Sequence, residues 1–265
     1  MLPPQTPQAD LRLALIATAR QMSTSGLTPG TAGNLSCRCR METEGNLCDG
    51  FLITPTGMPY AALEPADIVF LPLDFEGETH AQHSNRRAPS SEWRIHRDIY
   101  RARPQAGAVL HAHSPFATAL ACLHRDIPPF HYMVARFGGS TVHCARYATF
   151  GTQALSEAAL EALSERCACL LANHGMLVHG QSCAHAFELG LELETLCAQY
   201  WRACQLGAPV LLSAEEMARV LEKFAHYGQE GESGVVATAG GSSCKCFEGM
   251  QVGPGNVSSF HYPFE

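Results

Sequence analysis

No stretch of the sequence is apolar for long enough to cross a membrane, since the longest apolar runs, such as 168–172, are short. Residues 1–7 carry neither the basic region nor the apolar stretch of a secretory signal peptide. The 18 Lys and Arg residues are scattered against a net charge of −7, so no basic patch for nucleic acid is indicated. We therefore expect a cytoplasmic protein that binds neither membranes nor nucleic acid.

Common motifs of nucleotide binding and of nucleophilic catalysis are also missing. The loops rich in glycine match neither a P-loop nor a dinucleotide fingerprint. No serine lies in a nucleophile elbow, and no cysteine is flanked by activating groups. The sequence therefore argues against catalysis through a covalent serine or cysteine intermediate.

Cysteine, in contrast, is abundant, with 12 residues. Three pairs, at 37 and 39, 167 and 169, and 244 and 246, have one residue between them, whereas metal sites usually leave about two to four. Several cysteines lie in apolar stretches, where a free thiol behaves as a small hydrophobic side chain. We expect reduced and mostly structural thiols, as is usual in the cytoplasm.

The hydrophobic fraction of 46% is enough for a full core. Strand-like and helical patterns alternate irregularly, which predicts one α/β domain over residues 1–228. Residues 229–265 are rich in Gly and Ser and predict a flexible C-terminal tail. Helices are expected at 10–25, 89–102 and 182–207 and after the capping residues Ser114, Thr152 and Ser213, and strands at 35–39, 51–54, 67–71 and 106–110.

Two histidines, His111 and His113, follow the apolar segment 106–110. In an extended chain, side chains two residues apart lie on one face, so both imidazoles can point to one place. A third histidine from elsewhere would complete a three-nitrogen set with an open coordination position, the pattern of a catalytic zinc site. On its own, such a pair is more often found at a surface or in a core.

A second polar triplet, Asn173-His174-Gly175, lies between the apolar segments 170–172 and 176–178. This position predicts a turn at a strand end, where binding sites are often built. Because Asn and Gly are ordinary turn residues, a simple hairpin turn is the alternative interpretation.

Ser90, Ser91 and Glu92 stand at the predicted start of a helix. A serine cap and an acidic first turn explain them without any function. Free N–H groups and two hydroxyls could also bind a phosphate, and Glu92 could then be a metal ligand, a general base or both. The loops at 30–34 and 54–57 offer further N–H groups to an anion.

In this order, the motifs resemble the class II aldolase/adducin family, and within it the L-fuculose-phosphate aldolase-like sugar-phosphate aldolases. The resemblance implies a three-layer α/β/α domain with a central mixed, largely antiparallel sheet. It also implies a homotetramer with active sites between neighbouring subunits. The resemblance covers about residues 10–228 and rests on the segments 33–36, 53–57, 89–92, 109–115, 131–133, 147–152, 173–175 and 223–228.

The resemblance further implies roles for individual residues. His111, His113 and His174 would bind one Zn²⁺, or another divalent metal, per subunit. Glu92 would be a ligand that yields to substrate and then acts as the base, and Tyr132 from a neighbouring subunit would be the general acid. The substrate phosphate would be held by Asn34, Thr56, Gly57, Ser90 and Ser91, and the aldehyde side of the pocket would be lined by Phe150 and Tyr227.

The implied reaction is reversible aldol cleavage of a ketose 1-phosphate to dihydroxyacetone phosphate and an aldehyde. L-Fuculose 1-phosphate and a 5-deoxy or 5-methylthio pentulose 1-phosphate are equally plausible substrates. The same scaffold also serves sugar-phosphate 4-epimerases, sugar-acid-phosphate decarboxylases and methylthioribulose-phosphate dehydratases. A non-catalytic, adducin-like interaction module is the remaining alternative, and such a module should lack the histidines or the glutamate that this chain retains.

Overall fold

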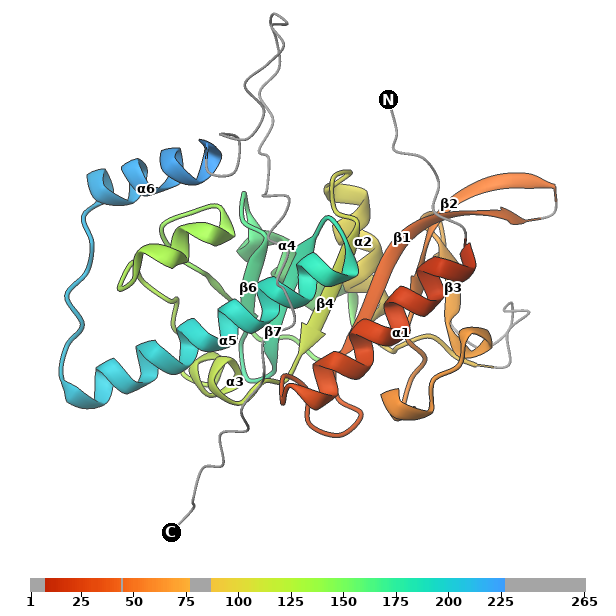
Figure 1. The fold of residues 1–265 in the computed structure, drawn as a ribbon, viewed down its shortest axis with the longest axis horizontal. Coiled ribbons are helices and arrows are strands. Elements are labelled where there is room, and N and C mark those ends of the chain that lie inside the picture. The colour runs from red at the N-terminus through yellow and green to blue at the C-terminus, as the bar shows by residue number, and fades with distance from the viewer. Residues whose placement is uncertain (1–7, 44, 77–86, 227–265) are drawn as a thin grey trace, which may run out of the picture.

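The computed structural model describes residues 8–43, 45–76 and 87–226. The expected tail, 229–265, and the expected pocket residue Tyr227 lie outside these ranges. Within them, a seven-stranded sheet carries helices on both faces (Figure 1). The predicted three-layer α/β/α architecture with a mixed, largely antiparallel sheet is confirmed.

The strands follow the order β3-β2-β1-β4-β7-β6-β5 across the sheet. Every neighbouring pair is antiparallel except β5 with β6, which is parallel. The order places β4, which carries His111, at the centre between β1 and β7. The strands are β1 (Asn34–Thr43), β2 (Asn46–Ile53), β3 (Val69–Pro72), β4 (Ala108–Ala112), β5 (Cys144–Ala145), β6 (Ala168–Leu171) and β7 (Gly175–Gly180).

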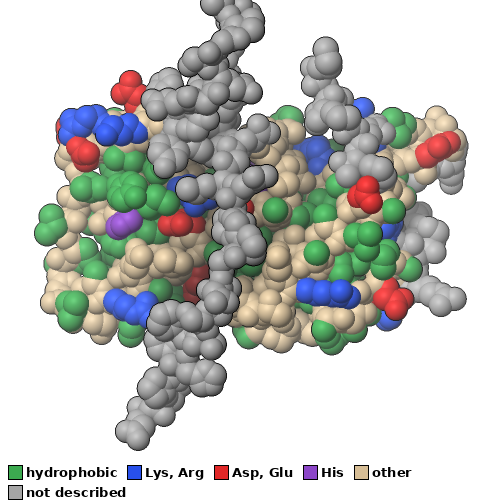
Figure 2. All heavy atoms as spheres, viewed as in Figure 1, with side chains coloured by type: hydrophobic (Ala, Val, Ile, Leu, Met, Phe, Trp, Pro, Cys, Tyr) green, Lys and Arg blue, Asp and Glu red, His purple; other side chains and the backbone are tan. Residues whose placement is uncertain are grey.

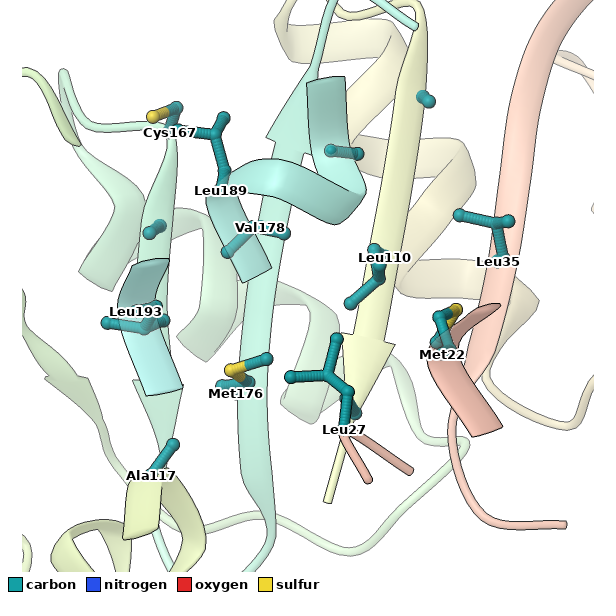
Figure 3. Packing of buried hydrophobic residues seen from close by; sticks show 14 of the residues in the cluster. Met22, Leu27, Leu35, Leu110, Ala117, Cys167, Met176, Val178, Leu189 and Leu193 are labelled. Atoms are coloured by element: carbon teal, nitrogen blue, oxygen red, sulfur yellow. The ribbon is translucent and has the colours of Figure 1, made fainter. Parts of the chain in front are cut away.

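Apolar side chains alternate between the two faces of the sheet, and each face has its own helices. Leu35 and Leu110 pack in one core cluster with residues of α1, α3 and α5, whereas Val109 packs in a second cluster with residues of α2 and α4. Figure 3 shows Leu189 and Leu193 among the first cluster. The helices are α1 (Gln8–Thr24), α2 (Trp93–Ala102), α3 (Pro115–Ala121), α4 (Gln153–Leu163), α5 (Cys183–Leu206) and α6 (Ala214–His226), with 3-10 turns η1 (Tyr60–Ala62), η2 (Pro65–Asp67) and η3 (Tyr132–Phe137).

Three helix starts follow the predicted caps, and two differ. The serine cap expected at 90–91 is wrong, because Glu92 itself occupies the N-cap position of α2. Thr152, Ser182 and Ser213 each accept a hydrogen bond from the backbone N–H three residues further on. Ser114 occupies the N-cap position of α3 but makes no cap hydrogen bond. Its hydroxyl donates to the Glu194 carboxylate, which accepts two backbone N–H groups of α3 in its place. A charged acceptor from α5 thus replaces the weaker hydroxyl cap.

The described part of the chain contains no helix that is long and apolar enough to cross a membrane. All ten cysteines in this part are free thiols, and six of them are buried. Burial raises the pKa of the Cys197 thiol well above its usual value, so the side chain stays protonated. The buried cysteines therefore act as small hydrophobic residues.

Candidate active site

Three histidines converge at one end of the central strands. His111 lies in β4, His113 directly follows that strand, and His174 lies in the turn between β6 and β7. One ring nitrogen of each lies within 4.8 Å of the other two. The ring centroids are 4.7 to 4.9 Å apart, with the rings edge to face. The fold therefore brings the three expected histidines together.

All three rings are held in the neutral form. His111 is fully buried, and its Nδ1 donates to the Met176 carbonyl at 2.9 Å. Burial, reinforced by the neighbouring His113, lowers the pKa of His111 to about 3. Burial also lowers the pKa of His174 to about 4, and it lowers the pKa of His113. Neutral imidazoles are the form that binds metal ions.

The turn that carries His174 depends on two unusual neighbours. Asn173 has a left-handed backbone with φ of 52°, which Asn tolerates better than most residues. Its side-chain oxygen is hydrogen-bonded by His124 Nε2. A Cβ on Gly175 would lie 2.4 Å from the Ala112 carbonyl oxygen, so only glycine lets the turn approach β4 this closely. These contacts fix the direction of His174.

Glu92 occupies the N-cap position of α2, but its carboxylate makes no cap hydrogen bond. Oε2 lies 3.2 Å from His111 Nε2 and accepts a hydrogen bond from Asn34 Nδ2 at 2.9 Å. Oε1 lies 3.3 Å from His174 Nε2. Glu92 is 6% exposed, and Oε1 accepts no hydrogen bond from any residue in the described ranges. A buried carboxylate oxygen without a donor calls for another partner.

The donor atoms of this cluster fit a divalent metal ion. Because His111 Nδ1 donates to a carbonyl, its Nε2 presents a lone pair to His113 Nε2, 3.0 Å away. The same lone pair faces the Glu92 carboxylate. The contact between this lone pair and the carboxylate is repulsive unless a proton or a cation lies between them. Imidazole nitrogens and a carboxylate oxygen form a typical ligand set for zinc and similar metals.

A buried chain of hydrogen bonds lies behind Glu92. Asn34 Oδ1 is 2.5 Å from His96 Nε2. Ser36 Oγ is 2.6 Å from His96 Nδ1 and 2.7 Å from the Tyr100 hydroxyl. All of these side chains are buried. Sequence analysis does not assign His96, Ser36 or Tyr100 to the site, although the four-residue spacing from Glu92 to His96 places both on one helix face.

A pocket opens beside the histidines and collects the expected phosphate ligands. Asn34 keeps one Nδ2 hydrogen for a ligand, because the other is donated to Glu92. Phe150 lines the pocket as expected and is 66% exposed. Sequence analysis did not place Tyr147 in this lining. The pocket is lined by Asn34, Thr56, Gly57, Ser90 and Ser91 together with Glu92, His113, His174, Tyr147, Ala148 and Phe150, and by five further residues of the adjoining loops.

Tyr132 does not line the described pocket of its own chain. It begins η3, is 50% exposed, and stacks on His131 at 4.8 Å and on Phe224 of α6 at 6.4 Å between ring centroids. Figure 2 shows hydrophobic side chains gathered on the surface beside α6. Tyr132 is thus half-exposed outside the pocket of its own chain.

Comparison with known proteins finds one family model that matches the chain. Its description is "Class II Aldolase and Adducin N-terminal domain", and the match spans residues 13–201. This range contains the three histidines, Glu92 and the loops that line the pocket.

Several curated relatives match most of the chain. A 5-methylthioribulose-1-phosphate/5-deoxyribulose-1-phosphate aldolase of Rhodospirillum rubrum is 52% identical over 222 residues, which are 84% of this chain and 94% of the relative. An L-fuculose phosphate aldolase of Escherichia coli is 43% identical over 215 residues, covering 81% of this chain and 94% of the relative. Among solved structures, an L-fuculose 1-phosphate aldolase superposes with a TM-score of 0.71 at 38% identity, covering 81% of this chain and 96% of its own.

Proposed function

This chain belongs to the class II aldolase and adducin family and is a metal-dependent aldolase, and from this premise we propose that it cleaves a 5-methylthio or 5-deoxy pentulose 1-phosphate with zinc as its metal. The products would be dihydroxyacetone phosphate and a short aldehyde. The observation that carries the proposal is that a cluster of possible metal ligands lies beside loops that could bind a phosphate. Neutral His111, His113 and His174 cluster with Glu92, and His113, His174 and Glu92 line the pocket together with loops rich in hydroxyl and N–H groups.

His111, His113 and His174, with Glu92, are the residues that would hold the metal. A divalent metal ion supplies Lewis-acid polarisation of a carbonyl and electrostatic stabilisation of the negative charge that develops as a carbon–carbon bond breaks. Imidazole nitrogens favour Zn²⁺ over Mg²⁺ or Ca²⁺, which prefer oxygen ligands. The donor set thus supports zinc.

The phosphate would be bound by the hydroxyls of Thr56, Ser90 and Ser91, by the backbone at Gly57 and by the remaining N–H of Asn34. Hydroxyl and N–H donors stabilise a dianion, and the start of α2 adds the positive end of its helix dipole. Fixing the phosphate also fixes the distance from the sugar carbons to Glu92, so binding energy distant from the reaction is used for orientation.

Glu92 would move the proton at the carbon of dihydroxyacetone phosphate that forms the new bond. Its buried position and its oxygen without a hydrogen-bond donor suit a general base. Tyr132 of a neighbouring subunit would accept the hydroxyl proton of the aldehyde half as the bond breaks, and would return it to the aldehyde oxygen in the condensation direction, since Tyr132 lies outside the pocket of its own chain. This assignment requires an assembly, and we propose a homotetramer with active sites between subunits.

The substrate preference is supported by the Rhodospirillum rubrum relative and by the aromatic wall of the pocket. Phe150 offers no hydrogen bond to a hydroxyl on the aldehyde half, but it can pack against a methyl or methylthio group. An apolar wall discriminates only weakly against an added hydroxyl. L-Fuculose 1-phosphate is therefore expected to be a slower substrate, by about 10- to 200-fold in kcat/KM.

The free thiols of the described residues suit a reducing compartment, which supports the proposal that the enzyme acts in the cytoplasm.

The specificity proposal is tested by measuring kcat/KM for dihydroxyacetone phosphate release from three sugars: 5-methylthioribulose 1-phosphate, 5-deoxyribulose 1-phosphate and L-fuculose 1-phosphate. We expect cleavage of the first two to be fastest. Conversion by dehydration or epimerisation, without release of dihydroxyacetone phosphate, would contradict aldol cleavage as the reaction.

A further inference from the structure

We infer that His96 is a positioning residue for Glu92 and that it acts through the side-chain amide of Asn34. The inference rests on the proposed role of Glu92 as the base. It adds a buried residue, absent from the pocket lining, that decides how the Glu92 carboxylate is held.

The chain of hydrogen bonds from Glu92 to Tyr100 forms where one face of a helix packs against one face of a strand. Glu92, His96 and Tyr100 are spaced by four residues and lie on one face of α2. Asn34 and Ser36 are spaced by two residues and lie on one face of β1. Asn34 pairs with His111 of β4 across the sheet, so this face of β1 is also the face that carries the metal site.

The direction of each hydrogen bond can be worked out from the Glu92 end of the hydrogen-bond chain. A carboxylate oxygen accepts hydrogen bonds, and Asn34 donates its Nδ2 group to Glu92 Oε2. The carbonyl oxygen of Asn34 then faces His96 and can only accept, so the proton of His96 must lie on Nε2. Burial lowers the pKa of His96 to about 3, and the ring is therefore neutral with a lone pair on Nδ1.

The rest of the chain follows in the same direction. Ser36 must donate its hydroxyl proton to His96 Nδ1, and its oxygen then accepts from the Tyr100 hydroxyl. Every donor thus points toward Glu92. If the proton of His96 lay on Nδ1, the Asn34 amide would turn over and set its carbonyl oxygen against the Glu92 carboxylate, which is repulsive.

The hydrogen-bond chain orients Glu92 but does not conduct protons to it. The Asn34 amide neither gains nor loses a proton at neutral pH, so it separates Glu92 from His96 as far as proton transfer is concerned. At the far end the Tyr100 hydroxyl is fully buried. The effect on Glu92 is geometric: Oε2 is held by Asn34, and Oε1 is left as the oxygen that can move a proton.

Two substitutions distinguish the contribution of Nε2 of His96 from that of Nδ1. The amide of Gln reaches about as far as His Nε2 and can still donate to Asn34, whereas the shorter amide of Asn reaches only the Nδ1 position beside Ser36. We expect His96→Asn to slow solvent exchange of the dihydroxyacetone phosphate proton by about 10- to 100-fold in kcat, the size of one hydrogen bond to a charged group. His96→Gln should restore most of that rate. KM for dihydroxyacetone phosphate and bound metal should match wild type in both variants.

A purely structural role predicts a different pattern, in which both variants lose thermal stability and lose exchange in parallel; that result, or equal exchange in both, would overturn the inference.

A second measurement needs no variant and no metal. NMR of the ring nitrogens in the metal-free wild-type protein should find His96 protonated at Nε2 and unprotonated at Nδ1, and the opposite tautomer would overturn the inference. A wild-type protein that exchanges no proton would instead contradict the proposed function, while the tautomer still tests the inference.

Discussion

The Nε2 atoms of His111 and His113 lie 3.0 Å apart, and His111 Nε2 also lies 3.2 Å from Glu92 Oε2. The Nδ1 of His111 is already committed to the Met176 carbonyl, so its Nε2 has a lone pair and no proton to offer. The lone pair of His111 Nε2 and the Glu92 carboxylate therefore face one another and repel. A metal ion relieves this repulsion, and the arrangement makes metal binding and stability of the site interdependent.

The first prediction concerns the metal ligands. His113→Ala should lose tightly bound metal and lose cleavage, because two nitrogens and a carboxylate bind a divalent ion much more weakly than three nitrogens and a carboxylate. The measurement is elemental analysis of the purified protein beside an assay for dihydroxyacetone phosphate.

A suitable control is His143→Ala, since His143 is paired with Asp126 and contributes nothing to the described metal cluster. This control should keep both the metal and the activity. An active His113→Ala protein without metal would show that the histidine cluster is not the working site.

The second prediction concerns Glu92. Glu92→Gln keeps the shape of the side chain but removes its basicity, so exchange of the dihydroxyacetone phosphate proton with solvent should fall by about 100- to 10,000-fold. Mass spectrometry or proton NMR in deuterated water measures this rate. Glu161→Gln, which changes an exposed partner of Arg146, should behave as wild type. Exchange at the wild-type rate in Glu92→Gln would exclude Glu92 as the base.

The third prediction concerns the phosphate. Ser91→Ala and Thr56→Ala should each raise KM for the sugar phosphate by about 10- to 100-fold, the expected loss for a hydrogen bond to a charged group. Thr24→Ala, on the exposed face of α1, serves as the control and should leave KM unchanged. The rise in KM should vanish for the corresponding unphosphorylated ketose; an equal rise for both sugars would argue against phosphate contact.

The fourth prediction concerns pH. Burial holds the pKa of both His96 and His111 at about 3 in the folded protein, against 6.5 when exposed. Below about pH 6.5 the unfolded chain therefore binds more protons than the folded chain, so stability should fall as pH drops from there toward about 3. Urea unfolding of the metal-free protein measures this loss, and His96→Gln should reduce the slope because one titrating group is gone. A midpoint that is constant between about pH 7 and pH 5 would contradict the assignment.

Much of the fold is readable from local chemistry. The caps at Thr152, Ser182 and Ser213 set helix starts, and alternation around Leu35 and Leu110 sets the faces of the strands. These signals are local, so a sequence contains them. The missing cap bond at Ser114 depends on Glu194, which comes from a distant helix, and no local pattern announces it.

The same distinction holds for the site. The pair His111 and His113 is visible as a spacing within one strand. The position of His174 at a strand end is visible too, but only the resemblance to a family joins it to that pair. The link from Asn34 to His96 joins residues sixty-two positions apart, and it depends on the register of β1 against β4 and on the rotation of α2. Strand register and helix rotation are tertiary properties, so the contacts of His96 and Ser36 could not be predicted from the sequence.

The central claim is that metal bound by the three histidines makes this chain an aldolase for ketose 1-phosphates. Titration of the metal-free wild-type protein with zinc, with release of dihydroxyacetone phosphate from 5-methylthioribulose 1-phosphate as the readout, tests it most directly. The account predicts no release without metal, and a rate that rises linearly and stops at one zinc per chain. Full activity in the metal-free protein, or no release at any zinc concentration, would contradict it.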